Sequence, residues 1–168
     1  MKEAEKWAIP GAGAIIISGD GLGQKILLQE RCKQDAPQET GMLEIPAGKI
    51  REFESVYDTV RREVKEETGL DIVKILGENE STVYESGGYR TLHFTPFSCS
   101  QNIQGIYPIM VFVFICSARG ELMCSSDEAK NFKWVDRQAL FRLVNETPER
   151  LYPMHVDTLR LFLDSNMI

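Results

Sequence analysis

The sequence predicts an α/β fold in which a mixed, partly antiparallel sheet lies between helices. Two apolar runs, residues 12–18 and 108–117, have the composition of buried strands, and the second is apolar on both faces, as expected of a central strand. An amphipathic segment at residues 56–68 and two shorter ones at residues 137–144 and 153–164 have helical periodicity.

The remaining strands are predicted from short apolar segments between turn signals. Gly19 to Gly23 is expected to be the turn of a hairpin that joins the first strand to a return strand at residues 25–30. Further strands are expected at residues 43–48, 71–76, 83–84, 91–94, 96–97 and 131–135, and loops at residues 32–41, 98–107 and 122–127.

The two C-terminal helices have predictable buried faces. Asp136 is expected to cap the helix at residues 137–144, and Pro153 to begin the last helix. Trp134, just before the first of them, is expected to anchor the core. The inward residues are predicted to be Leu140, Phe141, Leu143 and Val144, then Val156, Leu159 and Phe162 or Leu163.

The helix at residues 56–68 has clear boundaries and two distinct faces. Ser55 is a good N-cap, Asp58 suits the positive end of the helix dipole, and Gly69 can adopt the left-handed conformation that ends a helix. At about 100° per residue, one arc is apolar and a neighbouring arc is acidic. The apolar arc holds Val56, Tyr57, Val60 and Val64, and the acidic arc holds Glu63, Glu66 and Glu67.

The acidic arc overlaps the edge of the apolar one, so its carboxylates are expected to be half-buried. Crowded, partly desolvated carboxylates repel one another and need positive charge nearby. Arg62 can serve one of them, which leaves room for a hard cation such as Mg²⁺ or Mn²⁺. The helix alone leaves the alternative of a solvated acidic face open.

Together with the loop before it, this helix resembles the Nudix box, G-x5-E-x7-R-E-U-x-E-E-x-G-U, where U is a bulky aliphatic residue. Every specified position is filled, by Gly48, Glu54, Arg62, Glu63, Val64, Glu66, Glu67, Gly69 and Leu70. The resemblance implies a Nudix-type α/β/α sandwich and a metal-dependent pyrophosphohydrolase. Such an enzyme cleaves a nucleoside diphosphate linked to a group X into a nucleoside monophosphate and phosphorylated X, with Mg²⁺ or Mn²⁺ as cofactor.

The resemblance also implies roles for individual residues. Glu63 and Glu67 are expected to be the principal metal ligands, with Glu66 as a third and the carbonyl of Ala47 as a fourth. Arg62 is expected to orient Glu63. Glu54 would bind a second metal or orient water, unless it only caps the start of the helix.

The identity of the general base stays open at this point. In some branches of the resembling family a box glutamate, here Glu66, does this work, and in others a glutamate from a distant loop does. Glu128 is the candidate for an extra ligand or base in such a loop, with Asp127 as its nearest competitor and a solvated loop acid as the alternative.

Substrate contacts are predicted less sharply. Arg31 ends a strand where relatives often place an arginine near the substrate, although a surface arginine is the plain alternative. Glu44 is a further candidate substrate contact. Base recognition needs an aromatic platform, and the candidates are Tyr84, Tyr89, Phe94, Phe97 and Tyr107, with Arg90 for a phosphate.

The substrate class remains open between related alternatives. Glu44 before Pro46-Ala47-Gly48 is similar to ADP-ribose and nucleotide-sugar pyrophosphatases, yet the proline that marks ADP-ribose enzymes is replaced by the region Glu85-Ser86-Gly87-Gly88, and their extra N-terminal sheet is absent. A hydrolase of oxidised or non-standard dNTPs is one alternative. A catalytically silent, nucleotide-binding regulatory domain is another, which the four retained box glutamates disfavour.

Composition narrows the remaining possibilities. The 168 residues are 43% hydrophobic and 26% charged and are expected to form a single domain over residues 1–168, with a core at about 11–145 and a C-terminal helix at about 153–164. The net charge of −6 disfavours a nucleic-acid polymer as partner. A small-molecule nucleotide derivative is expected instead, and the oligomeric state stays open, a homodimer included.

The cysteines and the chain's start point to a cytoplasmic protein. Four cysteines without a C-x-x-C pair, and only two histidines, argue against zinc and fit a reducing compartment. The N-terminus lacks the apolar stretch of a signal peptide, and the longest apolar run, residues 109–116, is too short to span a bilayer.

Overall fold

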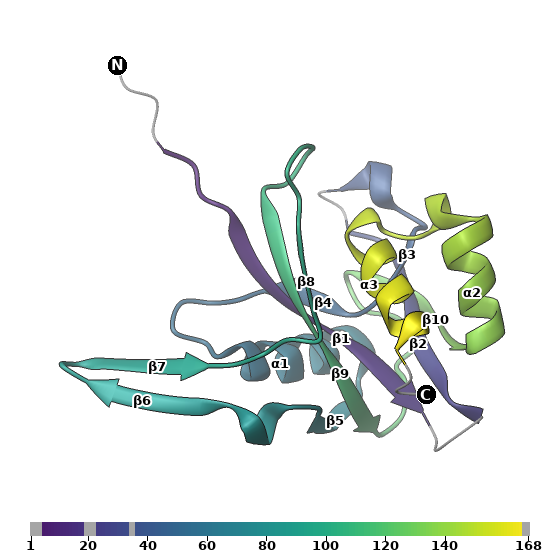
Figure 1. Cartoon of the computed structure of the whole chain (residues 1–168). Coiled ribbons are helices and arrows are strands. Elements are labelled where there is room, and N and C mark those ends of the chain that lie inside the picture. The colour runs from purple at the N-terminus through teal and green to yellow at the C-terminus, as the bar shows by residue number, and fades with distance from the viewer. Residues whose placement is uncertain (1–4, 19–22, 34–35, 166–168) are drawn as a thin grey trace.

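A twisted mixed sheet forms the middle layer of the fold (Figure 1). The computed structural model describes residues 5–18, 23–33 and 36–165; the expected turn at residues 19–23 falls, apart from Gly23, outside them. In order across the sheet, the main strands are β10 (Ala129–Asp136), β2 (Lys25–Arg31), β1 (Ile9–Ser18), β9 (Ile109–Arg119) and β5 (Asp71–Ile75). Three short strands pair with these main strands. The strand β3 (Leu43–Glu44) pairs with β2, β4 (Ala47–Lys49) pairs with β1, and β8 (Ser98–Gln101) pairs with β9.

The parallel pair β1 and β9 is the centre of the sheet. Ile9 to Ile17 pair in register with Ile109 to Ser117, whereas the pairs of β1 with β2 and of β9 with β5 are antiparallel. The apolar run of residues 108–117 therefore forms the expected central strand. It is apolar on both faces because helices cover both of them.

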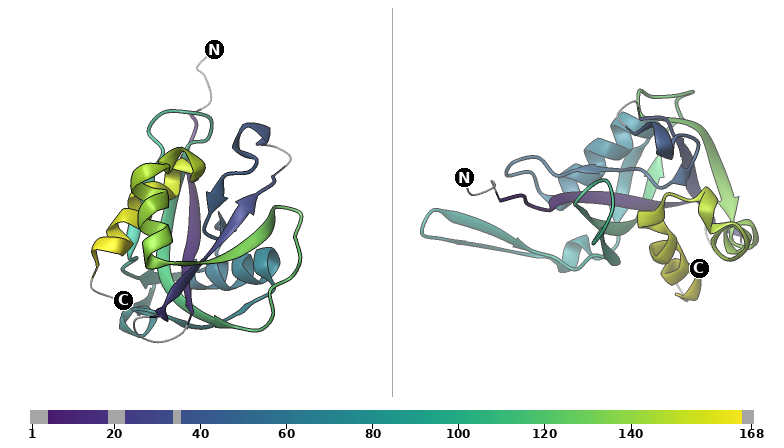
Figure 2. Two further views of the ribbon diagram at one scale, coloured as in Figure 1. Left: turned by 90° about the vertical axis from the view of Figure 1, so that its right-hand side faces the viewer. Right: turned by 90° about the horizontal axis from the view of Figure 1, so that it is seen from above.

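Helices cover both faces of the sheet, which gives an α/β/α sandwich with a mixed sheet, as predicted (Figure 2). Helix α1 (Val56–Thr68) packs on one face, where its valines meet Ala14, Ile16 and Phe114. Helices α2 (Arg137–Glu146) and α3 (Pro153–Asp164) cover the other face, on a core that includes Ile15, Leu28 and Val113. Short 3-10 turns occur at Pro37–Glu39, Glu78–Glu80 and Pro148–Arg150.

The boundaries of α1 are those that the sequence predicts. The Ser55 side chain accepts a hydrogen bond from the backbone N–H of Asp58 at 3.1 Å, and Gly69 has a φ of 82°. Val56, Tyr57, Val60 and Val64 are buried. Because the apolar arc fixes the rotation of the helix, the acidic arc faces the loop that ends in β4.

Four predictions about exposure and local structure are wrong. One is the strand expected at residues 96–97, which lie in a loop before β8. Trp134 is 37% exposed because β10 is an edge strand with a sheet neighbour on one side only. Phe141 is 55% exposed because it lies about 100° around α2 from the buried Leu140. The segment at residues 98–107 begins with β8, which pairs with β9, before it becomes a loop.

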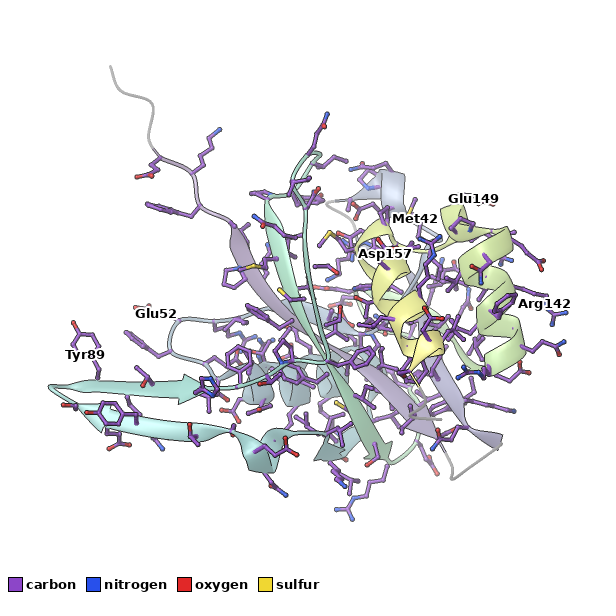
Figure 3. All side chains as sticks on the ribbon, viewed as in Figure 1. Met42, Glu52, Tyr89, Arg142, Glu149 and Asp157 are labelled. Carbon is purple, nitrogen blue, oxygen red and sulfur yellow. The ribbon has the colours of Figure 1, made fainter. Side chains whose placement is uncertain are left out.

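The strands β6 (Thr82–Ser86) and β7 (Tyr89–His93) form a separate hairpin that projects from the body of the molecule (Figure 3). Tyr89 lies at its tip, far from α1. No helix in the described ranges is long and apolar enough to cross a membrane.

Candidate active site

A pocket of about 330 Å³ lies beside the acidic arc of α1 and collects residues from distant parts of the chain. Its lining combines charged residues with apolar and aromatic ones. The charged lining residues are Arg31, Lys33, Glu44, Lys49, Arg51, Arg62, Glu63, Glu66 and Glu128. The apolar and aromatic ones are Ile9, Tyr107, Ile109, Val111, Tyr152 and His155, and Ala47 and Gly48 line the pocket as well.

Close packing between β4 and its neighbours brings backbone to the carboxylates. Gly13 on β1 pairs with Ala47, and a Cβ at residue 13 would lie 2.7 Å from the Ala47 Cβ. On its other side, β4 meets α1: the backbone N–H of Ala47 donates to Glu67 Oε2 at 3.2 Å. The loop can approach the helix this closely only because its residues are small.

Arg62 holds three of the box carboxylates at once. Its Nε and Nη2 donate to the two oxygens of Glu54 at 2.7 and 2.8 Å, and its Nη1 donates to Glu63 and, at 3.2 Å, to Glu66. Its Nη2 also donates to the carbonyl of Lys49 at 3.1 Å. This fork explains how one guanidinium orders the acidic arc, where the sequence suggested that it would serve a single acid.

The contacts of Arg62 and the degree of burial set the acidity of two of these groups. The bidentate hydrogen bonds from Arg62 lower the pKa of Glu54 to about 2. Burial raises the pKa of Glu63 in spite of its contact with Arg62. Glu66 is the exposed member of the set, with 52% of its side chain accessible.

Glu67 is the most deeply buried of the box carboxylates, at 2% exposure. Its Oε2 accepts hydrogen bonds from the Gln29 side chain at 2.7 Å and from the backbone of Ala47. Its Oε1 is buried and has no hydrogen-bond partner. Burial, and then the charge of Glu44, raise the pKa of Glu67 to about 8.

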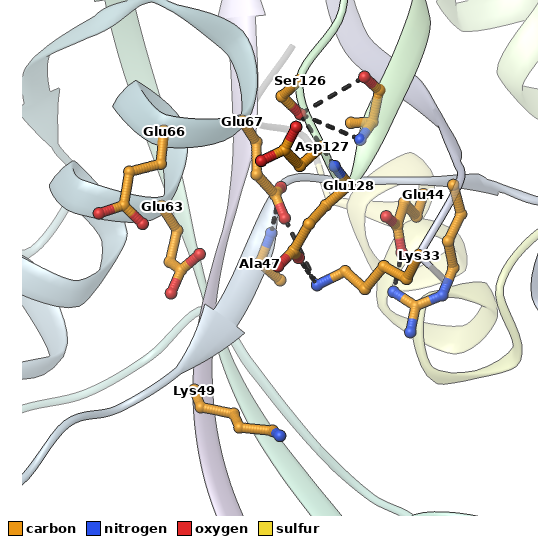
Figure 4. A network of polar contacts seen from close by, with 12 residues as sticks. Lys33, Glu44, Ala47, Lys49, Glu63, Glu66, Glu67, Ser126, Asp127 and Glu128 are labelled. Atoms are coloured by element: carbon orange, nitrogen blue, oxygen red, sulfur yellow. Dashed lines mark hydrogen bonds and ion pairs between the residues drawn. The ribbon is translucent and has the colours of Figure 1, made fainter. Parts of the chain in front are cut away.

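Lys33 and Glu128 also line the pocket, and they lie beside Glu67 (Figure 4). The Nζ of Lys33 lies 3.6 Å from Glu67 Oε1 and also contacts the carboxylate of Glu128. Glu128 therefore lines the pocket together with the box residues. Its competitor Asp127 is exposed and is not part of the pocket wall.

A second cluster of buried polar residues, centred on Arg31, forms the part of the pocket wall next to α3. Arg31 donates to Glu39 at 2.8 Å and to Glu44 at 3.0 Å, and its guanidinium lies 4.6 Å from the centre of the Tyr152 ring. The Tyr152 ring in turn meets His155 edge to face at 5.2 Å. Arg31 is therefore a buried residue of the pocket wall and not a solvated surface arginine.

His155 is fixed as a neutral imidazole. Its Nδ1 accepts a hydrogen bond from the backbone N–H of Ile45 at 3.3 Å, and complete burial lowers its pKa to about 3. Because Nδ1 is the acceptor, the ring proton lies on Nε2.

The chemistry of the donor set fits a hard divalent cation. Glu63, Glu66 and Glu67 supply carboxylate oxygens. The Oε1 atom of Glu67 is a buried acceptor without a hydrogen bond, which positive charge would stabilise. In the present arrangement the nearby positive charges are Arg62 and Lys33, and among the described residues no three His, Cys, Asp or Glu side chains converge on one point. These carboxylate oxygens are suitable ligands for such a cation, but in this structure Glu63 and Glu67 lie next to Arg62 and Lys33 instead.

Five of the predicted substrate contacts lie outside the pocket wall, namely Tyr84, Tyr89, Phe94, Phe97 and Arg90. Tyr84 and Arg90 are on the projecting hairpin, where Tyr84 is 70% exposed and Arg90 pairs with Glu85. Phe94 packs in the core under α1, with ring centres 5.4 Å from Phe112 and 6.5 Å from Tyr57. Arg31, Glu44 and the aromatic candidate Tyr107, by contrast, do line the pocket.

Sequence reasoning missed several residues that complete the site. Gln29 could have been predicted to be buried, because it lies two positions after Leu27 in a strand and its side chain is therefore on the same face of the sheet as that buried leucine. Lys33 gave no signal within its polar loop. The residues missed are Gln29, Lys33, Lys49, Arg51, Tyr152 and His155.

Comparison with known proteins gives a family and related folds. A family model described as "NUDIX domain" matches residues 7–155. The Caenorhabditis elegans protein named "Putative nudix hydrolase 1" is 37% identical over 81 residues, which are 47% of this chain but only 20% of that protein.

Solved structures agree in fold. The MutT protein from Methanosarcina mazei Go1 superposes with a TM-score of 0.61 at 23% identity, over 99% of this chain and 100% of that one. A Caenorhabditis elegans Ap4A hydrolase superposes with a TM-score of 0.54 at 16% identity, over 92% of this chain and 95% of that one. At these identities the likeness is one of fold.

Proposed function

Because this chain belongs to the Nudix family of hydrolases, we propose that it cleaves the pyrophosphate bond of a nucleoside diphosphate linked to a second group X, of the ADP-ribose or nucleotide-sugar type. The products would be a nucleoside monophosphate and phosphorylated X. The observation that carries this proposal is a single pocket beside the acidic arc of α1, whose lining combines basic residues that can bind a diphosphate with aromatic and apolar residues that can bind a nucleoside.

The proposed cofactor is Mg²⁺ or Mn²⁺, held by Glu63, Glu66 and Glu67 with the carbonyl of Ala47. A divalent ion held there would supply an acidified water and would neutralise phosphoryl oxygens. The burial of Glu67 and its orphaned Oε1 support its place among the ligands.

The remaining steps fall to the protein's own groups. Arg62 keeps Glu63 and Glu66 oriented through its fork, and it fixes Glu54 as an ionised carboxylate. Lys49 and Arg51, which line the pocket, can bind phosphate oxygens of the substrate. The carboxylate of Glu128 is the proposed acceptor of the proton from the attacking water, since its loop lies at the pocket and its side chain is half-exposed.

Two other substrate classes belong in any substrate test. The sequence resemblance leaves oxidised or non-standard dNTPs open, and one protein of the same fold is named an Ap4A hydrolase, which adds dinucleoside polyphosphates. The family membership makes a nucleotide derivative the expected substrate in each case.

The test is a substrate panel with purified protein and Mg²⁺. ADP-ribose, nucleotide sugars, dinucleoside polyphosphates and oxidised dNTPs are incubated with and without the metal, and nucleoside monophosphate release is measured. We expect metal-dependent release, highest with ADP-ribose or a nucleotide sugar. Turnover confined to oxidised dNTPs or dinucleoside polyphosphates would replace the proposed substrate class, and no turnover at all would favour a binding domain.

A further inference from the structure

Lys33 is placed unusually for a residue of a polar loop. It follows β2, yet its side chain is only 18% exposed and reaches between α1 and the loop before β10. There its ammonium group is shared by two carboxylates, Glu67 at 3.6 Å and Glu128 in direct contact. Figure 4 shows these contacts, with Lys49 directed elsewhere.

The contact with Lys33 compensates the atom of Glu67 that the fold leaves unsatisfied. Gln29 and the Ala47 backbone bind Oε2, so Oε1 is buried without a hydrogen bond. A buried carboxylate oxygen in that situation is costly unless positive charge lies near it. In this structure Lys33 supplies positive charge at Oε1.

We propose that Lys33 is the internal counter-ion of the metal site: its ammonium group compensates Glu67 when no metal is bound, and a divalent cation must displace it. This inference rests on the proposed function in one respect only, that Glu67 is a metal ligand.

The chemistry of the two basic residues explains why Lys33, and not Arg62, is the displaced group. Arg62 is fixed by hydrogen bonds to Glu54, Glu63, Glu66 and the Lys49 carbonyl, and a planar fork with so many partners resists movement. Lys33 has a single charged head on a flexible stem. A cation bound to Glu67 Oε1 repels that head directly at a separation of a few ångströms.

The consequence is a competition that sets the affinity for metal. The cation must break the contacts of Lys33 before it gains those of Glu67, so part of its binding free energy is offset. Removing the lysine charge should therefore tighten metal binding and, in the absence of metal, weaken the folded state.

The test compares Lys33→Met with wild type and with Lys49→Met, which removes the same charge from the same pocket without breaking the contact to Glu67. Mn²⁺ binding to the three proteins is followed by electron paramagnetic resonance at one and the same pH. We expect Lys33→Met to bind Mn²⁺ about tenfold more tightly than wild type. Lys49→Met should change the affinity less than about threefold, as a charge at greater distance does.

Thermal unfolding gives an independent measurement. In chelator, Lys33→Met should unfold at a lower temperature than wild type, and saturating Mn²⁺ should abolish or reverse that difference. Equal or weaker Mn²⁺ binding by Lys33→Met would overturn the inference while leaving the proposed metal site in place. If wild type binds no Mn²⁺ at all, the metal assignment of the proposed function falls, and the inference falls with it.

Discussion

The carboxyl group of Glu63 lies directly against the backbone of Gly48. A Cβ added at residue 48 would be 2.0 Å from Glu63 Cδ, far inside van der Waals contact. The first glycine of the box is thus needed for its lack of a side chain, because it lets β4 approach the acidic arc of α1.

Gly48→Ala should therefore damage the site more than the fold. The new methyl group must push Glu63 out of its contact with Arg62, and we expect at least about a tenfold loss of Mn²⁺ affinity and of kcat/KM, with a loss of stability of about 1–3 kcal/mol. Mn²⁺ titration, steady-state kinetics and chemical denaturation measure the three quantities. Gly23→Ala is the matched control, since nothing lies within 4 Å of its added Cβ. Full affinity in Gly48→Ala would show that Glu63 does not depend on this contact.

Glu67→Gln tests whether the charge of the most buried proposed ligand is needed for turnover, independently of its packing. The substitution keeps the volume that packs against Gln29 and Ala47 but removes the charge, so we expect turnover to fall by at least about a hundredfold with an intact circular dichroism spectrum. Glu78→Gln is the control, because Glu78 pairs with Arg61 and is not part of the pocket wall. Near-full activity of Glu67→Gln would remove Glu67 from the metal site.

Glu128→Gln tests the proposed base. If its carboxylate accepts the proton of the attacking water, kcat should fall by about 10²–10⁴-fold while KM changes little. Asp127→Asn, in the same loop but outside the pocket wall, should retain wild-type kinetics. An unchanged kcat in Glu128→Gln would reject the base role, and transfer of the loss to Asp127→Asn would reassign it.

His155 predicts a specific acid sensitivity of folding. Its pKa is about 3 in the folded protein and about 6.5 in the unfolded chain. The unfolded state therefore binds the proton more readily, and stability is lost as the pH falls below about 6.5, by up to about 1.4 kcal/mol per pH unit.

His155→Gln should lose that slope, since the amide can accept from Ile45 N–H without titrating. Urea unfolding at several pH values between neutral and mildly acidic compares the two proteins. Parallel stability curves for wild type and His155→Gln would mean that His155 is not buried as a neutral group.

Much of the fold follows from local patterns in the sequence. Ser55 and Gly69 bound α1, and the spacing of Val56, Val60 and Val64 fixes which face is buried. Trp134 could not be placed this way, since its exposure depends on β10 being an edge strand, and that depends on pairing with β2 far away in the sequence.

The residues of the candidate site are likewise of two kinds: those that a local sequence pattern predicts and those that only tertiary packing brings to the pocket. Glu63, Glu66 and Glu67 lie on one helix, and helical periodicity brings them together. Lys33, Tyr152 and His155 reach the pocket only through tertiary packing, so no local pattern identifies them. Tyr84 and Arg90 were candidates by residue type alone, and the hairpin carries them away from the pocket.

The most direct test of the whole account is a crystal structure of the protein grown with Mn²⁺, with anomalous diffraction data. We expect an anomalous peak coordinated by Glu63 and Glu67, beside the Ala47 backbone, with the Lys33 ammonium moved away from Glu67. A map without a peak there, with Glu67 still paired to Lys33 in saturating Mn²⁺, would contradict the claim that the acidic arc of α1 is the metal site.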